Sequence, residues 1–244
     1  MLKVCKFGGS SVAGAEQFRK VRDIVLSDDS RRVVVISAAG KRTSDDHKLT
    51  DLLYLCHAHL TYGVSCADIL AAIRSRFVSI RDELGLSYRV EDEFDAYAAT
   101  LSRDTSVDEL VSRGEYFTAR LMAETLGYAF VDAADCVFFG FDGQFDRART
   151  DAAIADALEK NGKIVLPGFY GRVPTGKIKV MTRGGSDITG ALAAAAVNAD
   201  VYENWTDVSG ILMADPRIVE NPRPIPRITY AELREMAFMG ASVL

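Results

Sequence analysis

Residues 180–197, "VMTRGGSDITGALAAAAV", change character in their middle, and this junction decides how the fold is assigned. A β-favouring run gives way to two glycines, a Ser-Asp pair and an alanine-rich stretch of helical pattern. The free N–H groups and the dipole of a helix N-terminus favour negative charge, and the bare backbone of Gly184 and Gly185 lets an anion approach. Ser186 or Asp187 can equally cap an ordinary helix there. The stretch alone leaves both interpretations open.

Three other expected strands end in similar turns of small residues. These turns hold Lys6 with Gly8 and Gly9, the run from Ser37 to Gly40, and Gly168 with Phe169. Because the carboxyl ends of parallel strands meet at one edge of a sheet, we expect the four turns to converge there. Lys6 and the neighbouring amides can then reach a transferring phosphate, while Arg183 offers a planar cationic fork. The sequence has neither the residue order of a P-loop nor a G-x-G-x-x-G fingerprint.

The order of hydrophobic patterns predicts a three-layer α/β/α sandwich with a central, mainly parallel sheet. Strands are expected at residues 2–7, 31–40, 128–139 and 162–171, with a strand, a turn and a possible hairpin over 200–217. Helices are expected at residues 15–26, 150–160 and 229–242, and most of 49–126 has a helical pattern. The polar segment 40–51, "GKRTSDDHKLTD", is expected to form a loop.

Composition argues against several classes of protein. The chain has 244 residues, 48% of them hydrophobic, so it can bury a full core, yet no apolar run is long enough to span a bilayer. The N-terminus lacks the long apolar segment of a signal peptide. A formal net charge of −5 gives no support for a nucleic-acid surface. The four cysteines are scattered without a C-x-x-C pair, which favours the reducing cytoplasm over a zinc or disulfide framework. We predict no metal site built from protein side chains.

Five blocks along the chain carry a resemblance to a known family. They read "KFGGSSV", "SRGEYFTARLM", "GFYG", "TRGGSDITGALAAAAV" and "WTDVSGILMADPRIV". In this order they resemble the catalytic domain of the aspartate kinase family, within the amino-acid kinase superfamily, over nearly the whole chain. The resemblance implies transfer of the γ-phosphoryl group of MgATP to the side-chain carboxylate of L-aspartate, at the start of lysine, threonine and methionine synthesis. A carboxylate is already nucleophilic at neutral pH, so such a reaction needs alignment and charge neutralisation rather than a general base.

By this resemblance, Lys6 neutralises charge on the phosphoryl group in flight and Asp187 helps to organise the cationic centre around the phosphates. Glu115 takes the ammonium group of aspartate, and the fork of Arg183 holds a carboxylate. The other implied amino-acid-binding positions are Ser37, Thr50, Phe169, Gly184, Gly185 and Ser186. The implied nucleotide-binding positions are Lys6, Gly8, Gly9, Ser10, Thr206, Asp207, Leu212 and Arg217. ATP is the implied cofactor, with Mg²⁺ carried by its phosphates.

The resemblance also implies a division of the domain and two departures from the family pattern. An amino-acid-binding lobe is expected over about residues 1–170 and a nucleotide-binding lobe over about 171–244. Leu212 stands where some relatives carry a tyrosine, and Ser242 stands where many carry a lysine that faces the phosphates. The family habit implies a possible homodimer, and two regulatory ACT domains, which residues 1–244 do not contain, normally follow the kinase domain.

Two other functions remain open from the sequence. Another acyl-phosphate-forming kinase, of the glutamate 5-kinase or acetylglutamate kinase type, shares glycine-led loops and a "TDV-x-G" segment, although "SRGEYF" and "RGGSD" favour aspartate. A non-catalytic relative that binds an amino acid or a nucleotide is the alternative from a different class. The presence of Lys6, Glu115, Arg183 and Asp187 together disfavours it.

Overall fold

The computed structural model describes residues 1–182, 184–207, 210–215 and 218–239. It divides into two compact units, Met1–Trp205 and Thr206–Leu244. The predicted division into an amino-acid lobe and a nucleotide lobe concerns ligand binding, and it stays a prediction.

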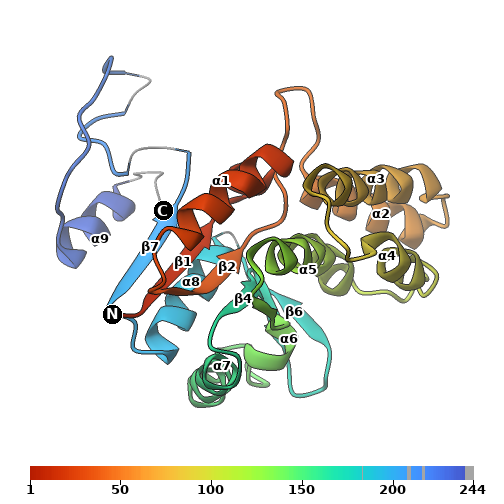
Figure 1. The fold of residues 1–244 in the computed structure, drawn as a ribbon. Helices are drawn as coiled ribbons and strands as arrows, with labels where there is room; N and C mark the ends of the chain where they lie inside the picture. Colours follow the sequence, from red (N-terminus) through yellow and green to blue (C-terminus); the bar gives the residue numbers. More distant parts are fainter. Residues whose placement is uncertain (183, 208–209, 216–217, 240–244) are drawn as a thin grey trace. The chain divides into compact units, whose positions relative to one another are not determined.

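The first unit is built around a sheet of five parallel strands in the order β3-β4-β2-β1-β7 (Figure 1). The strands are β1 (Lys3–Phe7), β2 (Arg31–Ile36), β3 (Ala129–Phe130), β4 (Ile164–Pro167) and β7 (Val201–Trp205). Their apolar residues are almost fully buried in the three central strands, as expected for a parallel sheet covered on both faces. The predicted α/β sandwich with a mainly parallel sheet is confirmed.

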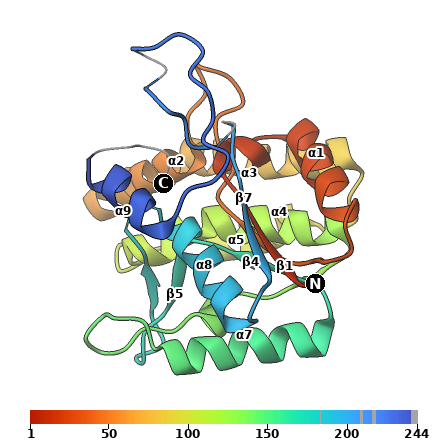
Figure 2. The same cartoon turned by 90° about the vertical axis from the view of Figure 1, so that its left-hand side faces the viewer.

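Alternation along β1 distributes its side chains between two cores. Cys5 and Phe7 belong to the core that includes α1 (Ala15–Leu26) and α5 (Val107–Leu126). Val4 belongs to the opposite core, which includes α7 (Arg147–Asn161) and α8 (Gly185–Ala196). Figure 2 shows α8 in front of the strands and α5 behind them. Because side chains alternate with a period of two, Lys6 faces the same side as Val4, toward α8.

Three further helices pack beyond α5, on the side away from the sheet (Figure 1). They are α2 (Leu49–Tyr62), α3 (Ala67–Leu84) and α4 (Val90–Ala98). The rings of Phe77, Phe94 and Phe117 meet there with centroids 5.3 to 6.0 Å apart. This apolar cluster fixes α3 and α4 against α5, and the mainly helical pattern predicted for residues 49–126 is confirmed.

The structure corrects the strand predicted over residues 128–139. Only Ala129 and Phe130 pair in the sheet, and the short helix α6 (Ala133–Cys136) follows. The carboxylate of Asp132 accepts a hydrogen bond from the backbone N–H group of Ala134, which starts the helix at that point. The strand predicted over 162–171 is divided between β4 and β5 (Tyr170–Arg172), and β5 pairs antiparallel with β6 (Ile178–Val180).

The second unit contains the helix α9 (Tyr230–Phe238). Its start is a capping box: the N–H group of Glu232 donates to the hydroxyl of Thr229, and the N–H group of Thr229 donates to the carboxylate of Glu232. Leu212 and Pro224 form an antiparallel bridge within the same unit. Across the described parts of both units, no helix has the length and apolar character needed to cross a membrane.

Candidate active site

Lys6 is a buried cation at the end of a strand. It is the fourth residue of β1 and is only 7% exposed. Its Nζ atom lies 2.8 Å from Oδ1 of Asp187, in the first turn of α8. A buried ammonium group is strongly unfavourable unless it is paired, and this carboxylate is its partner at the edge of the sheet.

Asp187 accepts a second hydrogen bond that the sequence interpretation missed. Nδ2 of Asn204 donates to the same Oδ1 atom at 2.8 Å. The parallel register of β1 with β7 pairs Lys6 directly with Asn204, so both side chains lie on the face that α8 covers. The available signal was the polar Asn204 two residues after Tyr202 on a strand, a spacing that places both on one face.

The turns that follow β1 and β2 are in direct contact. The N–H group of Gly40 donates to the carbonyl oxygen of Gly9 at 2.8 Å. A Cβ atom on Gly40 would lie 2.6 Å from that same carbonyl oxygen, and a Cβ atom on Gly9 would lie 2.9 Å from the carbonyl oxygen of Ala38. Both turns therefore require glycine for their close approach. Gly8 lies beside the cation, since a Cβ atom placed on it would be 3.7 Å from Nζ of Lys6.

The turn after β4 packs against the first turn of α8. A Cβ atom on Gly168 would lie 2.6 Å from Oγ of Ser186, and one on Gly185 would lie 2.7 Å from the ring of Phe169. Phe169 has a φ of 77°, a left-handed conformation that is unusual for a bulky side chain and marks a constrained turn. Oγ1 of Thr189 accepts from the N–H group of Phe169 at 3.1 Å and holds that turn on the helix.

The predicted convergence of the four turns is confirmed by these contacts. The turn after β1 contacts the turn after β2, and the N–H group of Gly168 donates to the carbonyl oxygen of Ile36 at the end of β2. Gly168 in turn contacts the start of α8, where Gly184 has a φ of 77°. The result is one rim with a buried cation, bare backbone and a helix N-terminus, which together suit a polyanion.

Glu115, on α5, is a buried carboxyl group with no ion-pair partner among the described residues. It is 5% exposed, and its Oε2 atom has no hydrogen-bond partner among the described residues. Burial raises the pKa of Glu115 to about 8, although the N–H groups of Glu115 and Ala38 act in the opposite direction. Its neighbour Gly114 packs on the turn after β2, since a Cβ atom there would lie 3.0 Å from Cβ of Ala38. Such a group is suited to receive a cation from outside the protein.

Ser37 and Thr50 reach this region from different elements. Ser37 follows β2 directly, and its N–H group donates to the carbonyl oxygen of Phe7 at 3.2 Å. Thr50 lies in the first turn of α2, at the point where the loop expected over residues 40–51 and the helical pattern expected from residue 49 overlap. The adjacent Leu49 is fully buried, and its Cδ2 atom lies 3.7 Å from the Cβ position of Gly114. The start of α2 is therefore anchored next to Glu115.

The remaining predicted residues lie in the turn after β1, in the second unit or outside the described residues. Ser10 is exposed in the 3₁₀ turn Gly9–Val12 of the first unit. Thr206, Asp207 and Leu212 belong to the second unit, where the hydroxyl of Thr206 donates to Oδ1 of Asp207 at 3.1 Å. Arg183, Arg217 and Ser242 lie outside the described residues, and their predicted roles stay predictions.

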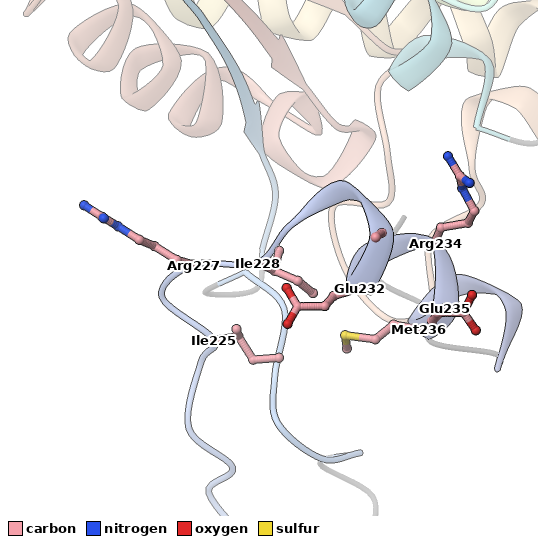
Figure 3. Close-up of a pocket in the computed structure, with 8 residues that line it drawn as sticks. Ile225, Arg227, Ile228, Glu232, Arg234, Glu235 and Met236 are labelled. Atoms are coloured by element: carbon pink, nitrogen blue, oxygen red, sulfur yellow. The ribbon is translucent and has the colours of Figure 1, made fainter.

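Two cavities contain none of the predicted site residues. One, of about 550 Å³, lies in the second unit; in Figure 3, Ile225, Ile228 and Met236 lie close to Glu232 while Arg227 points away. The other, of about 510 Å³, is lined by residues of α5, α6 and α7. Neither of these two cavities includes Lys6, and the candidate site is defined by the rim contacts described above. Within the described ranges, no three His, Cys, Asp or Glu side chains are grouped to hold a metal ion.

Comparison with known proteins gives one family. The sequence profile of the amino acid kinase family matches residues 1–244. Aspartokinase 3 of Bacillus subtilis is 35% identical over 256 residues, which cover 99% of this chain and 56% of that protein. The lysine-sensitive aspartokinase 3 of Escherichia coli is 36% identical over 267 residues, which cover 99% of this chain and 57% of that protein. The chain thus spans a little over half the length of these curated relatives.

Solved structures give the same result. The aspartate kinase of Clostridium acetobutylicum superposes with a TM-score of 0.93 at 45% identity, over 97% of this chain and 55% of that one. Aspartokinase III of E. coli, in complex with aspartate and ADP, superposes with a TM-score of 0.83 at 32% identity, over 100% of this chain and 57% of that one. The resemblance indicated by the sequence motifs is confirmed.

Proposed function

We propose that this chain, which belongs to the amino acid kinase family, transfers the γ-phosphoryl group of MgATP to the side-chain carboxylate of L-aspartate and forms 4-phospho-L-aspartate. The observation that carries this proposal is the position of Lys6. Its buried ammonium group lies 2.8 Å from Asp187 at a rim where glycine-containing turns meet. A cation and backbone amides fixed in one place are what phosphoryl transfer requires, because catalysis depends on alignment and on neutralising charge.

On the phosphate side, Lys6 stabilises charge on the phosphoryl group as it passes to the acceptor. The backbone of Gly8, Gly9 and Ser10 and the N-terminus of α8 supply N–H groups for the phosphate oxygens. Asp187 orients the ammonium group of Lys6, and Asn204 fixes the carboxylate of Asp187. Mg²⁺ bound to the nucleotide supplies further neutralisation of phosphate charge. Mg²⁺ prefers oxygen ligands and retains water, so phosphates can carry it without a protein cage.

On the amino-acid side, ionised Glu115 receives the ammonium group of aspartate, and Arg183 holds a carboxylate. The other residues assigned to this side are Ser37, Thr50, Phe169, Gly184, Gly185 and Ser186. The acceptor carboxylate needs no base, and Lys6, paired with Asp187, is assigned to charge neutralisation instead. The role of each residue here is part of the proposal.

The relatives support the choice of substrates. Aspartokinase III of E. coli, of which 57% is covered by this chain, has been crystallised with aspartate and ADP. By the same similarity, we assign Thr206, Asp207, Leu212 and Arg217 to the nucleotide. All four cysteines are free and buried, which is consistent with a reducing compartment, and we assign the chain to the cytoplasm as a possible homodimer.

The test is an ATP-turnover assay with L-aspartate, L-glutamate and N-acetyl-L-glutamate side by side, with hydroxylamine present to trap an acyl phosphate as its hydroxamate. We expect ADP release and hydroxamate formation with L-aspartate. A preference for glutamate or its acetyl derivative would replace the substrate but not the reaction. Binding of aspartate and ATP without turnover would instead identify a non-catalytic relative.

A further inference from the structure

Arg76, on α3, is a buried arginine outside the rim. It is 5% exposed, yet it lies on the first unit's helical layer and not on the sheet. Its Nη1 atom donates to the carbonyl oxygen of His47 at 2.8 Å, and its Nη2 atom donates to the carbonyl oxygen of Gly40. Nη2 also lies 3.6 Å from the carboxylate of Asp46. One guanidinium fork thus holds three points of a single loop.

Those three points include both ends of the loop from residue 40 to residue 48, which joins the turn after β2 to the start of α2. Within the loop, Asp46 also accepts hydrogen bonds from the side chain of Arg42 at 2.8 and 3.1 Å, and from its N–H group at 3.0 Å. Arg76 and Arg42 therefore share one carboxylate. The guanidinium group of Arg76 thus contacts the loop near both of its ends and at Asp46.

Both ends of this loop contact the candidate active site. At one end, the N–H group of Gly40 donates to the carbonyl oxygen of Gly9, beside Lys6. At the other end, the buried Leu49 starts α2 and packs next to Gly114, the neighbour of Glu115. The loop therefore connects the turn assigned to the phosphates with the helix end assigned to the amino acid, so that its conformation sets their separation.

An apolar side chain could fill the space of Arg76 without the desolvation penalty of a buried charged group. Burial of a guanidinium group carries a desolvation penalty that its hydrogen bonds only offset, and burial lowers the pKa of Arg76. What the planar fork adds is geometry, because it binds two carbonyl groups at a fixed separation. The observed partners, two carbonyl groups at opposite ends of one loop, use that property.

We propose that Arg76 is a positioning residue, which sets the alignment of the two substrates by fixing both ends of the loop at residues 40–48. Lost alignment lowers kcat more than it weakens the binding of either substrate, since misplacement by about 1 Å is enough to slow a reaction about a hundred-fold. This inference rests on the proposed phosphoryl transfer to aspartate.

The test compares Arg76→Met and Arg76→Lys with Arg74→Met. Arg74 lies on the same helix and makes a surface ion pair with Asp95 at 2.8 Å, so it is a matched control without contact to the loop. We expect Arg76→Met to lower kcat, per folded molecule, by about ten-fold or more, with KM for ATP and aspartate changed by less than about three-fold. Arg76→Lys retains the charge without the fork and gives an intermediate kcat, and Arg74→Met leaves kcat unchanged.

Limited trypsin digestion supplies a readout that does not depend on activity. Cleavage after Lys41 and Arg42, both exposed in the loop, should be faster in Arg76→Met than in the wild type and unchanged in Arg74→Met. A folded Arg76→Met protein with wild-type kcat, or with a lower kcat but unchanged cleavage, would overturn the inference. If Arg76→Met fails to fold, Arg76→Lys decides by the same two readouts. A wild-type chain without turnover on aspartate would instead refute the proposed function, while the cleavage rates would still show whether Arg76 fixes the loop.

Discussion

Two carboxylates at the candidate site are held in opposite ways. Asp187 lies in the first turn of α8 with a cation and an amide donating to the same oxygen, each at 2.8 Å. Glu115 lies in the middle of α5 and is buried, with one oxygen that has no hydrogen-bond partner among the described residues. Asp187 already has protein partners for its charged oxygen. Glu115 keeps an oxygen without a partner among the described residues, and an incoming cation would supply one.

The difference has an electrostatic cause. Asp187 is partly exposed and is paired with the ammonium group of Lys6. Burial raises the pKa of Glu115 to about 8, so near neutral pH this carboxyl group is largely protonated in the free protein. Binding of an ammonium group would favour the ionised form. The comparison predicts that changes near Asp187 act on the chemical step, whereas changes at Glu115 act on binding and on pH dependence.

The largest effect is expected from Lys6→Met. It removes the buried cation while the rest of the rim remains, and transition-state charge stabilisation of this kind contributes on the order of 3 kcal/mol, which is at least about a hundred-fold in kcat. Steady-state ADP release with saturating aspartate and ATP measures it. Lys3→Met, on the same strand but paired with Asp28 away from the rim, is the matched control and should retain its kcat. A folded Lys6→Met protein with wild-type kcat would refute the central role of Lys6.

Glu115→Gln should act on the binding of aspartate and not on the chemical step. Loss of the charge that receives the ammonium group costs about 2 kcal/mol, so we expect KM for aspartate to rise about 30-fold while KM for ATP changes little. Glu124→Gln is the control on the same helix, because Glu124 already accepts from Ser87 and Tyr88. Equal increases in both KM values would show that Glu115 does not distinguish the two substrates.

The stability of the free protein should show the raised pKa directly. Between pH 5.5 and 7, both above the ordinary pKa of 4.5 and below about 8, folded Glu115 holds a proton that the unfolded chain has released. The free energy of unfolding that this residue contributes therefore falls as the pH rises, by about 2 kcal/mol across this window. Glu115→Gln has no such group to titrate, so the difference in free energy of unfolding between the variant and the wild type should shift in favour of the variant as the pH rises from 5.5 to 7. Urea unfolding of both proteins at the two pH values measures the difference, and a constant difference would show that the pKa is not raised.

The smallest effect is expected from Asn204→Leu. The substitution removes one hydrogen bond to Asp187 but leaves its ion pair with Lys6, so the loss is about 1 kcal/mol, or about five-fold in kcat. KM for aspartate should stay within about two-fold, because Asn204 contacts Asp187 and is not assigned to the binding of aspartate. A larger change in KM for aspartate than in kcat would mean that the two regions are coupled and that their separation is incorrect.

Several features of the fold and the site were predictable because they depend on local sequence. The bounds of α1, the strand β1 and the start of α8 follow from periodicity and from the glycines before the helix. The convergence of turns after β1, β2 and β4 was predictable as well, because parallel strands place all their carboxyl ends at one edge. The strand predicted over 128–139 failed because the cap at Asp132 starts a helix, a local competition that a hydrophobic pattern does not reveal.

The sequence by itself therefore determined the fold class, the family resemblance and which turns converge at one edge of the sheet, since these follow from the strand and helix periods and from the positions of the glycines. Only the tertiary structure decided that Asn204 joins Lys6 at Asp187, that Oε2 of the buried Glu115 has no hydrogen-bond partner among the described residues, and that Arg76 holds both ends of the loop before α2. Each of these depends on strand register or on helix packing between residues tens to nearly two hundred positions apart. Burial and pairing of charges are properties of that packing, because the same side chain is solvated or desolvated according to what covers it.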